Sequence, residues 1–167
     1  MFFFLKKKTL FSNKFLLFIF ILLIVCSIFF QNLPNDIFKY MLDLSFGFNQ
    51  EKVFFTYESL GEIGRKNYIY SALILDTIFP FLYTLFFILV SFKNNINNKF
   101  LIFIPILSGA FDILENILIS KMMFSKSFED ISLYEIFLGS IFNQCKWILI
   151  SITLLMIAFK IMNRRLV

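Results

Sequence analysis

Four long apolar segments constrain this chain more than any other feature of its sequence. They cover residues 15–31, 68–92, 100–120 and 137–161, close to the roughly 20 apolar residues that a helix needs to cross a bilayer. Inside lipid the backbone has to satisfy its own hydrogen bonds, so spanning segments of this kind form helices. The sequence therefore predicts one all-α domain over residues 1–167, a polytopic four-transmembrane-helix bundle.

The composition supports a membrane protein and excludes several kinds of site. Hydrophobic residues make up 59% of the chain and the mean hydropathy is +0.82, whereas a soluble domain is typically about 45–50% apolar. There is no histidine, and the two cysteines, Cys26 and Cys145, lie within apolar segments. The usual ligands of zinc, haem and copper are therefore missing, and any metal would have to be a hard cation held by oxygens. We expect no metal site, no cofactor and no nucleic-acid partner.

The charged residues outside the apolar segments fall into two unequal sets. Residues 1–14, 92–99 and 160–167 carry nine basic residues and no acid, whereas residues 31–67 and 121–136 carry six basic and eight acidic residues. The positive-inside rule then places both termini in the cytoplasm and both longer connections outside, in a protein of the cell membrane. No small-residue cleavage pattern follows the first apolar segment, so we interpret it as a retained helix rather than a signal peptide.

The extracytoplasmic connection of residues 31–67 has a pattern of its own. Pro34 and Asn35 indicate the start of a helix. Apolar residues recur at helical spacing at Val53, Phe54, Tyr57 and Leu60. We expect short amphipathic helices that lie in the membrane interface or cover the bundle, with Gly61 and Gly64 at a helix end or turn. The alternative is a surface connector without a covering role.

Three acidic residues lie inside the predicted membrane helices. They are Asp76 in the second helix and Asp112 and Glu115 in the third. An ionisable group at the centre of a membrane helix costs about 2.5–3.5 kcal/mol on insertion scales and by default marks a functional site. At 1.5 Å per residue, all three lie roughly 9–13 Å from the outer face. Close carboxylates in a low dielectric cannot all stay ionised, so we expect one to be protonated at neutral pH or a cation to neutralise them.

Pro80 follows Asp76 by one helical turn, and Tyr83 lies on the same face. Because proline has no N–H group, the carbonyl of Asp76 loses its helical partner and needs a donor from a neighbour or from water. A simple packing kink is the alternative interpretation of Pro80. In the third helix, the small residues Ser108 and Gly109 share a face with the acids and would allow a close helix contact.

Other polar residues fall in the same outer layer, which suggests a pocket that opens outward. Lys146 lies about 100° from Trp147 around the fourth helix, so it can extend to the interface instead of pointing inward. The connection of residues 31–67 is expected to cover the pocket, with Arg65 near its mouth. The remaining expected lining residues are Asn116, Tyr83, Tyr68, Asn143, Gln144 and Trp147.

Three functions fit this pattern, and the sequence leaves open whether the protein is an enzyme. The first is a binding protein or enzyme for a lipid-like or small amphipathic ligand, in which Asp76 and Glu115 form an acid–base or cation-binding pair oriented by Asp112 and Asn116. The second is a proton- or cation-coupled transporter that acts as a homodimer. The third is a membrane scaffold whose acids only hydrogen-bond the helices together. Membrane lipid is the expected surrounding partner.

Three motifs carry a resemblance to known proteins. G-x-x-G-R-x-x-Y begins at Gly61, D-x-x-x-P-x-x-Y at Asp76 and D-x-x-E-N at Asp112; together they resemble a pattern of small, functionally uncharacterised four-helix membrane proteins. The long first connection, and the acid, proline and tyrosine of the second helix, are also similar to the emopamil-binding/sigma-2-receptor family. That second resemblance implies sterol-like ligands or isomerisation by buried acids. The D-x-x-E-N motif and the lack of histidine depart from it.

Overall fold

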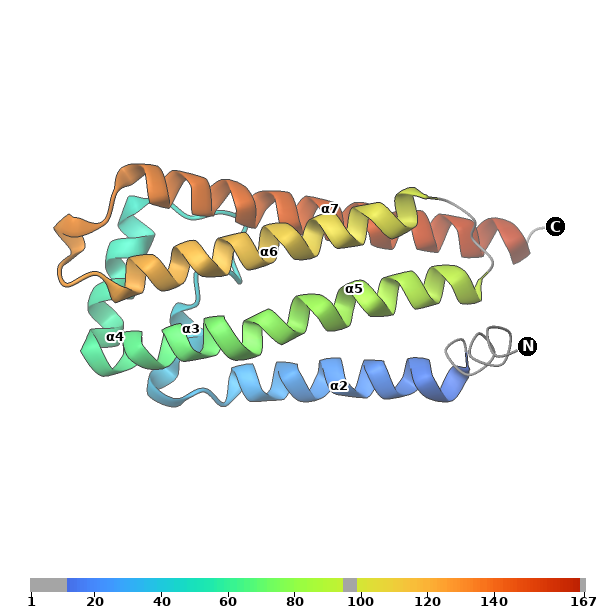
Figure 1. Cartoon of the computed structure of the whole chain (residues 1–167), viewed down its shortest axis with the longest axis horizontal. Coiled ribbons are helices and arrows are strands. Elements are labelled where there is room, and N and C mark those ends of the chain that lie inside the picture. Colours follow the sequence, from blue (N-terminus) through green and yellow to red (C-terminus); the bar gives the residue numbers. More distant parts are fainter. Residues whose placement is uncertain (1–11, 95–98, 166–167) are drawn as a thin grey trace, which may run out of the picture.

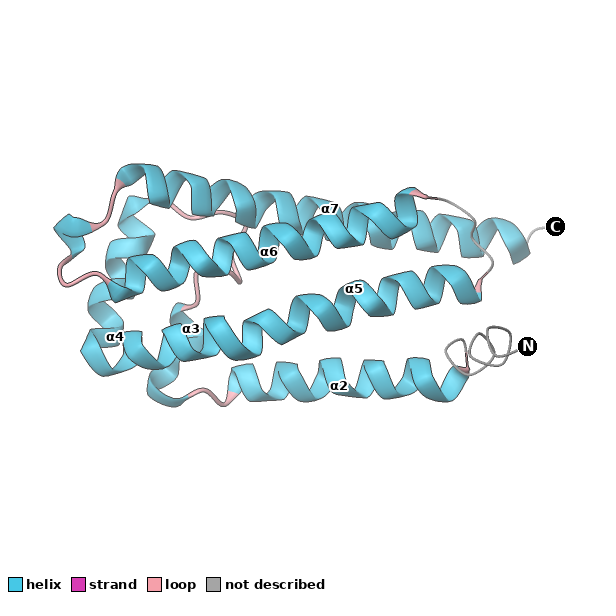
Figure 2. Cartoon of the chain, viewed as in Figure 1, coloured by secondary structure: helices cyan, strands magenta, loops and turns pink. Residues whose placement is uncertain are grey.

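The computed structural model describes residues 12–94 and 99–165, and the regular elements in these ranges are all helices (Figures 1 and 2). Lys6, Lys7 and Lys8, three of the basic residues assigned to the cytoplasmic side, lie outside the described residues. The α-helices are α2 (Asn13–Gln31), α3 (Ile37–Tyr40), α4 (Gln50–Tyr70), α5 (Asp76–Lys93), α6 (Phe100–Phe124) and α7 (Leu133–Arg165). Two 3₁₀ turns, η1 (Pro34–Asp36) and η3 (Phe128–Asp130), and one π-helical turn, η2 (Ser71–Leu75), complete the described elements.

Four stretches of helix are long and apolar enough to cross a membrane. They are Asn13–Gln31, Gln50–Lys93, Phe100–Phe124 and Leu133–Asn163. The second stretch combines α4, η2 and α5, with a break in the helical geometry at Gly61. The all-α prediction and the four apolar spans are therefore confirmed, while the helical run before α5 starts well ahead of the predicted residue 68.

Helices α2, α5, α6 and α7 run side by side along the length of the molecule (Figure 1). α6 packs against both α5 and α7, whereas α2 packs mainly against α5. α2 begins, α5 ends, α6 begins and α7 ends at one end of the molecule, and α3 and α4 lie at the other (Figure 1). Because α6 has a neighbour on two sides, the polar residues of its inner face can reach both α5 and α7.

The connection after α2 differs in detail from the expected short helices. A 3₁₀ turn, η1, begins at Pro34, and the four-residue helix α3 follows at Ile37. The amphipathic segment forms α4, whose helical geometry is interrupted at Gly61. The Asn49 side chain caps α4 by accepting a hydrogen bond from the N–H of Lys52 at 2.9 Å. Gly61 has a φ of 58° and interrupts the helical geometry, which confirms the predicted turn there, while Gly64 lies within the helix.

The residues between α3 and α4 are not helical, and several of them are buried. Leu42 is fully buried, Asp43 is 5% exposed and Phe48 is 7% exposed. Leu42 and Phe48 join the hydrophobic core that also contains buried residues of α4 and α6. The connection therefore enters the helical body instead of lying only on its surface, and it brings a carboxylate with it.

Gly109 allows α5 and α6 to approach closely. A Cβ atom at this position would lie 2.9 Å from Thr84 Oγ1, which donates a hydrogen bond to the carbonyl of Pro105 at 3.0 Å. We predict that Gly109→Val lowers the free energy of unfolding by about 1–3 kcal/mol, because the added methyl groups overpack the contact. Thermal unfolding in detergent measures this. Ala110→Val adds similar bulk at an exposed neighbour and serves as the control; equal unfolding temperatures for the two variants would contradict the prediction.

Candidate functional site

Asp76 lies where the geometry of the helix changes. The preceding turn, η2, is π-helical, and the N–H of Asp76 donates to the carbonyl of Ser71, five residues back. π-Helical turns inside α-helices are rare and occur frequently at functional sites. The wider turn changes the direction of the residues that follow it, and Asp76 is the first of these.

Pro80 leaves the backbone carbonyl of Asp76 without a helical partner, as the sequence predicts. The Asn116 side chain of α6 donates a hydrogen bond to this carbonyl, with Nδ2 2.7 Å from the oxygen. Both residues are buried. The expected donor is therefore a neighbouring helix, and Asn116 connects α6 to α5 at the level of the acid.

Lys146 of α7 points into the protein and lies against two acids of α6. Its Nζ is 3.1 Å from Asp112 Oδ1 and 2.7 Å from Glu115 Oε2, and the lysine is 4% exposed. Asp112 and Glu115 are three residues apart on a helix, so both can face the same ammonium group. The sequence left the direction of Lys146 open and did not include it in the site. In the structure its ammonium group is the cation that pairs with both acids of α6.

Asp112 is held on both of its oxygens. Besides the ion pair at Oδ1, its Oδ2 accepts a hydrogen bond from the Tyr83 hydroxyl of α5 at 3.1 Å. The Tyr83 hydroxyl also lies 3.3 Å from Ser108 Oγ, and Ser108 Oγ donates to the backbone carbonyl of Lys146 at 3.2 Å. Three helices therefore meet in one hydrogen-bonded group around Asp112.

Asn143 connects Glu115 to the connection between α3 and α4. Its Nδ2 donates to Glu115 Oε1 at 2.8 Å and to the carbonyl of Asp43 at 3.1 Å, and its Oδ1 accepts from the N–H of Gly47 at 2.6 Å. Trp147 Nε1 also donates to the carbonyl of Asp43, at 3.2 Å. These bonds hold the non-helical segment against α7.

Asp43 is a member of the site that the sequence reasoning missed. Its Oδ1 accepts a hydrogen bond from the Tyr68 hydroxyl at 3.0 Å, and Tyr68 Oη accepts one from the N–H of Leu42 at 2.9 Å. The signal was present in the sequence, because Asp43 lies between Leu42 and Leu44 in an apolar stretch that ends at Gly47. Assigning residues 31–67 to the outside hid it among the surface charges.

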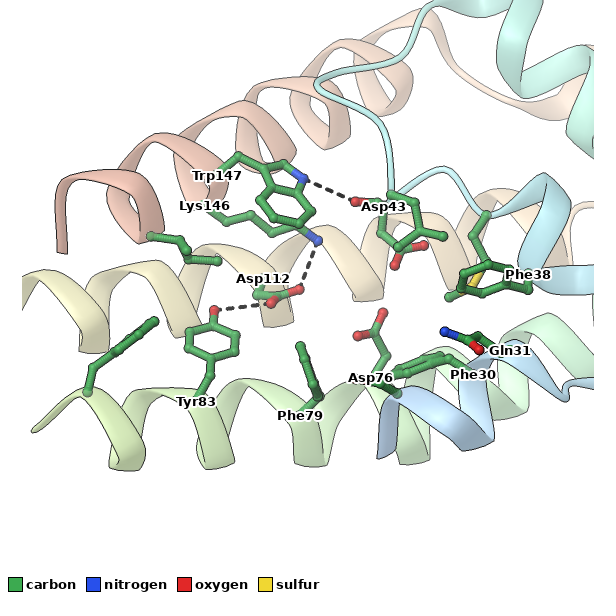
Figure 3. Close-up of a pocket in the computed structure, with 15 residues that line it drawn as sticks. Phe30, Gln31, Phe38, Asp43, Asp76, Phe79, Tyr83, Asp112, Lys146 and Trp147 are labelled. Atoms are coloured by element: carbon green, nitrogen blue, oxygen red, sulfur yellow. Dashed lines mark hydrogen bonds and ion pairs between the residues drawn. The ribbon is translucent and has the colours of Figure 1, made fainter. Parts of the chain in front are cut away.

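A cavity of about 400 Å³ lies between the acids and the aromatic residues of the surrounding helices (Figure 3). The polar residues of its wall come from α2, from the connection between α3 and α4, and from helices α5, α6 and α7. The lining residues are Ser27, Phe30, Gln31, Phe38, Met41, Asp43, Leu44, Asp76, Phe79, Tyr83, Phe87, Asp112, Lys146, Trp147 and Ile150. Most of this wall is apolar, so the cavity can hold a largely apolar molecule with a polar end.

Asp76 differs from Asp112 and Glu115 because no basic side chain of the described residues forms an ion pair with it. Its Oδ2 is buried and has no hydrogen-bond partner among the described residues, and the same holds for Oδ1 of the neighbouring Asn116. Leaving a buried polar group without a partner costs about 1–3 kcal/mol, and more for a charged group. The described residues include no cluster of three or more acidic or cysteine side chains that could hold a metal ion. Asp76 is therefore the group of the wall most able to bind a polar atom of a ligand.

The expected site residues fall into three groups. Asp76, Asp112, Tyr83 and Trp147 line the cavity. Glu115, Asn116, Tyr68 and Asn143 lie behind its wall, each bonded to a lining residue or to the backbone of one. Arg65 and Gln144 do neither. Arg65 stacks on Tyr57, 3.8 Å from its ring centroid, and donates to the Tyr57 carbonyl, while Gln144 lies beside Gly47.

Comparison of this chain with protein-family profiles, with curated proteins and with solved structures found no significant match in any of the three.

We predict that Lys146→Met lowers the free energy of unfolding by about 3–5 kcal/mol, because it leaves two buried carboxylates without their cation. Thermal or denaturant unfolding in detergent measures the loss. The triple variant Lys146→Met/Asp112→Asn/Glu115→Gln removes the charges together and should regain most of the stability. If the triple variant were no more stable than Lys146→Met, charge neutralisation would not be the role of this lysine.

Proposed function

We propose that this protein is a four-span membrane protein that binds a lipid-like or small amphipathic molecule in its cavity. One observation carries the proposal: a cavity of about 400 Å³ with a mainly aromatic and aliphatic wall contains Asp76, a buried carboxylate whose Oδ2 has no partner in the described residues. Binding pockets for small molecules are typically about 300–1,000 Å³, mostly apolar, with a few well-placed polar groups. This cavity has that size and that composition.

The distribution of charge supports the orientation expected from the sequence. Lys93, Lys99 and Lys160 lie near the end of the molecule where α2 begins and α7 ends, and acids such as Glu51 and Glu62 lie on α4 at the other end (Figure 1). With the basic end in the cytoplasm, the cavity lies in the outer half of the membrane. The protein would then meet its ligand from the outer leaflet or from outside the cell.

The packing of the helices supports entry from the membrane. Residues of both α2 and α7 line the cavity, yet in the described part of the chain these two helices do not form a packed pair. Ser27, Phe30 and Gln31 of α2 face Lys146, Trp147 and Ile150 of α7 across the cavity. An apolar molecule dissolved in the bilayer could pass between two helices that are not packed together more easily than through the contacts of α6.

The alternative functions have less support. An acid–base pair of Asp76 and Glu115 is disfavoured, because Glu115 is paired with Lys146 and Asn143 and does not line the cavity. A transport pathway would have to pass the half of the molecule filled by two apolar clusters, centred on Tyr83, Phe87, Leu101 and Ile157 and on Leu16, Ile19 and Leu89. A pure scaffold would not need a cavity with an unpaired carboxylate, since each such group costs stability.

We predict that filling the cavity displaces its ligand. Ser27→Phe adds a ring to the cavity wall and should lower ligand occupancy about tenfold or more, because overpacking a bound site costs about 1–3 kcal/mol. Native mass spectrometry of the purified protein measures the bound mass. Ile28→Phe adds a ring at the next residue, which is 53% exposed, and is the matched control. Equal occupancy in the two variants would place the ligand outside this cavity.

The unpaired state of Asp76 gives a second, independent prediction. Asp76→Asn should raise the free energy of unfolding by about 0.5–2 kcal/mol, because binding residues are commonly held at the expense of stability. Asp112→Asn should lower it, since Asp112 has partners on both oxygens. Unfolding temperatures of the two variants in the same detergent decide the point. A similar loss in both would indicate that Asp76 serves only to hold the helices together.

A further inference from the structure

The charges on the cavity wall do not balance. Three carboxylates line the cavity, those of Asp43, Asp76 and Asp112, together with one ammonium group, that of Lys146. The ammonium group is already engaged by Asp112 and by Glu115 behind the wall. In the ranges that the structure describes, no basic side chain forms an ion pair with Asp43 or Asp76.

Asp43 and Asp76 extend toward one another across one end of the cavity (Figure 3). Both are buried. The only donor to the Asp43 carboxylate in the described residues is the Tyr68 hydroxyl, and Asp76 Oδ2 has none. Two neighbouring carboxylates in a low dielectric repel each other, and a positive group between them removes that repulsion.

We propose that the ligand is a cationic amphiphile whose ammonium group lies between Asp43 and Asp76; this rests on the function proposed above and specifies the chemical class of the ligand. An ammonium group donates up to three hydrogen bonds and neutralises charge, so it can satisfy both acids. A hydroxyl group donates one hydrogen bond and leaves the charge unbalanced. A carboxylate or a phosphate group would be repelled by the same two acids.

The rest of the cavity fits the remainder of such a molecule. Phe30, Phe38 and Phe79 lie around the acidic end (Figure 3), and aromatic faces attract cations as well as apolar groups. If each non-hydrogen atom takes about the 30 Å³ of a water molecule in the liquid, the cavity of about 400 Å³ holds roughly a dozen such atoms. A single hydrocarbon chain with a small amine head has this size.

The only tryptophan of the chain gives a direct measurement. Trp147 lines the cavity, so its fluorescence reports occupancy in protein reconstituted into phosphatidylcholine vesicles. The probes share one chain length and differ in the head: dodecylamine, dodecan-1-ol, dodecanoate and dodecylphosphocholine. Ser27→Phe, with the cavity blocked, measures partition into the vesicles alone. We expect dodecylamine to bind saturably, with a Kd about tenfold or more below that of dodecan-1-ol, and dodecanoate not to bind.

Variants assign the effect to the two acids. Asp76→Asn should raise the Kd for dodecylamine about tenfold and leave that for dodecan-1-ol unchanged, because only the charged partner is lost. Asp43→Asn should act in the same direction, and Asp36→Asn, an exposed acid of the same connection, should have no effect. Thermal unfolding of each variant verifies that it is folded, so a loss of binding can be assigned to the charge.

The outcomes separate this proposal from the function on which it rests. Equal affinity for dodecylamine and dodecan-1-ol would overturn the cationic head and leave an amphiphile-binding cavity. Absence of saturable binding for all four probes, with Ser27→Phe identical to the wild type, would overturn both. Dodecylphosphocholine binding as tightly as dodecylamine, and sensitive to Asp76→Asn, would support a cationic head and identify a phospholipid as its source.

Discussion

The contact on which the rest of the site depends is that of the Lys146 ammonium group with the carboxylates of Asp112 and Glu115. A charge removed from water is tolerated only when it is paired and its remaining hydrogen bonds are satisfied. Both conditions are met here by residues from different elements: Tyr83 of α5 donates to Asp112, and Asn143 of α7 donates to Glu115. Through Asn143 the same group holds the connection between α3 and α4. The ion pair is thus the point at which α5, α6, α7 and the connection are joined.

Unlike Asp112 and Glu115, Asp76 forms no ion pair among the described residues. The π-helical turn before it and Pro80 after it disturb the regular helix on both sides, and Asn116 repairs the backbone by binding the carbonyl of Asp76. The side chain receives no such compensation at Oδ2. Acids that stabilise the fold and an acid available for binding therefore lie within one polar layer. Their roles differ because Lys146 can reach α6 and does not pair with α5.

The connection between α3 and α4 also supplies a carboxylate, that of Asp43, to the wall of the cavity. Its non-helical residues are bound to α7 through the carbonyl of Asp43 and the N–H of Gly47, and Gly47 adopts a φ of 78° that favours glycine. The Asp43 carboxylate then faces the cavity from the side opposite Asp76 (Figure 3). A segment that lies outside the predicted apolar spans thereby contributes a carboxylate to the wall of a buried cavity. The proposal of a cationic ligand rests on the charge of this carboxylate together with that of Asp76.

The sequence by itself determined the class of fold, the four apolar spans, the acids on the inner face of α6 and the need of the Asp76 carbonyl for a donor. Each of these follows from local periodicity or from the covalent structure of proline. Only the tertiary structure decided which acid is neutralised, since that depends on the direction of Lys146, on the π-helical turn and on the path of residues 41–49. A lysine on a membrane helix can extend outward or inward at similar local energy. The direction of the Lys146 side chain is set by Asp112 and Glu115, which lie more than twenty residues away in the chain.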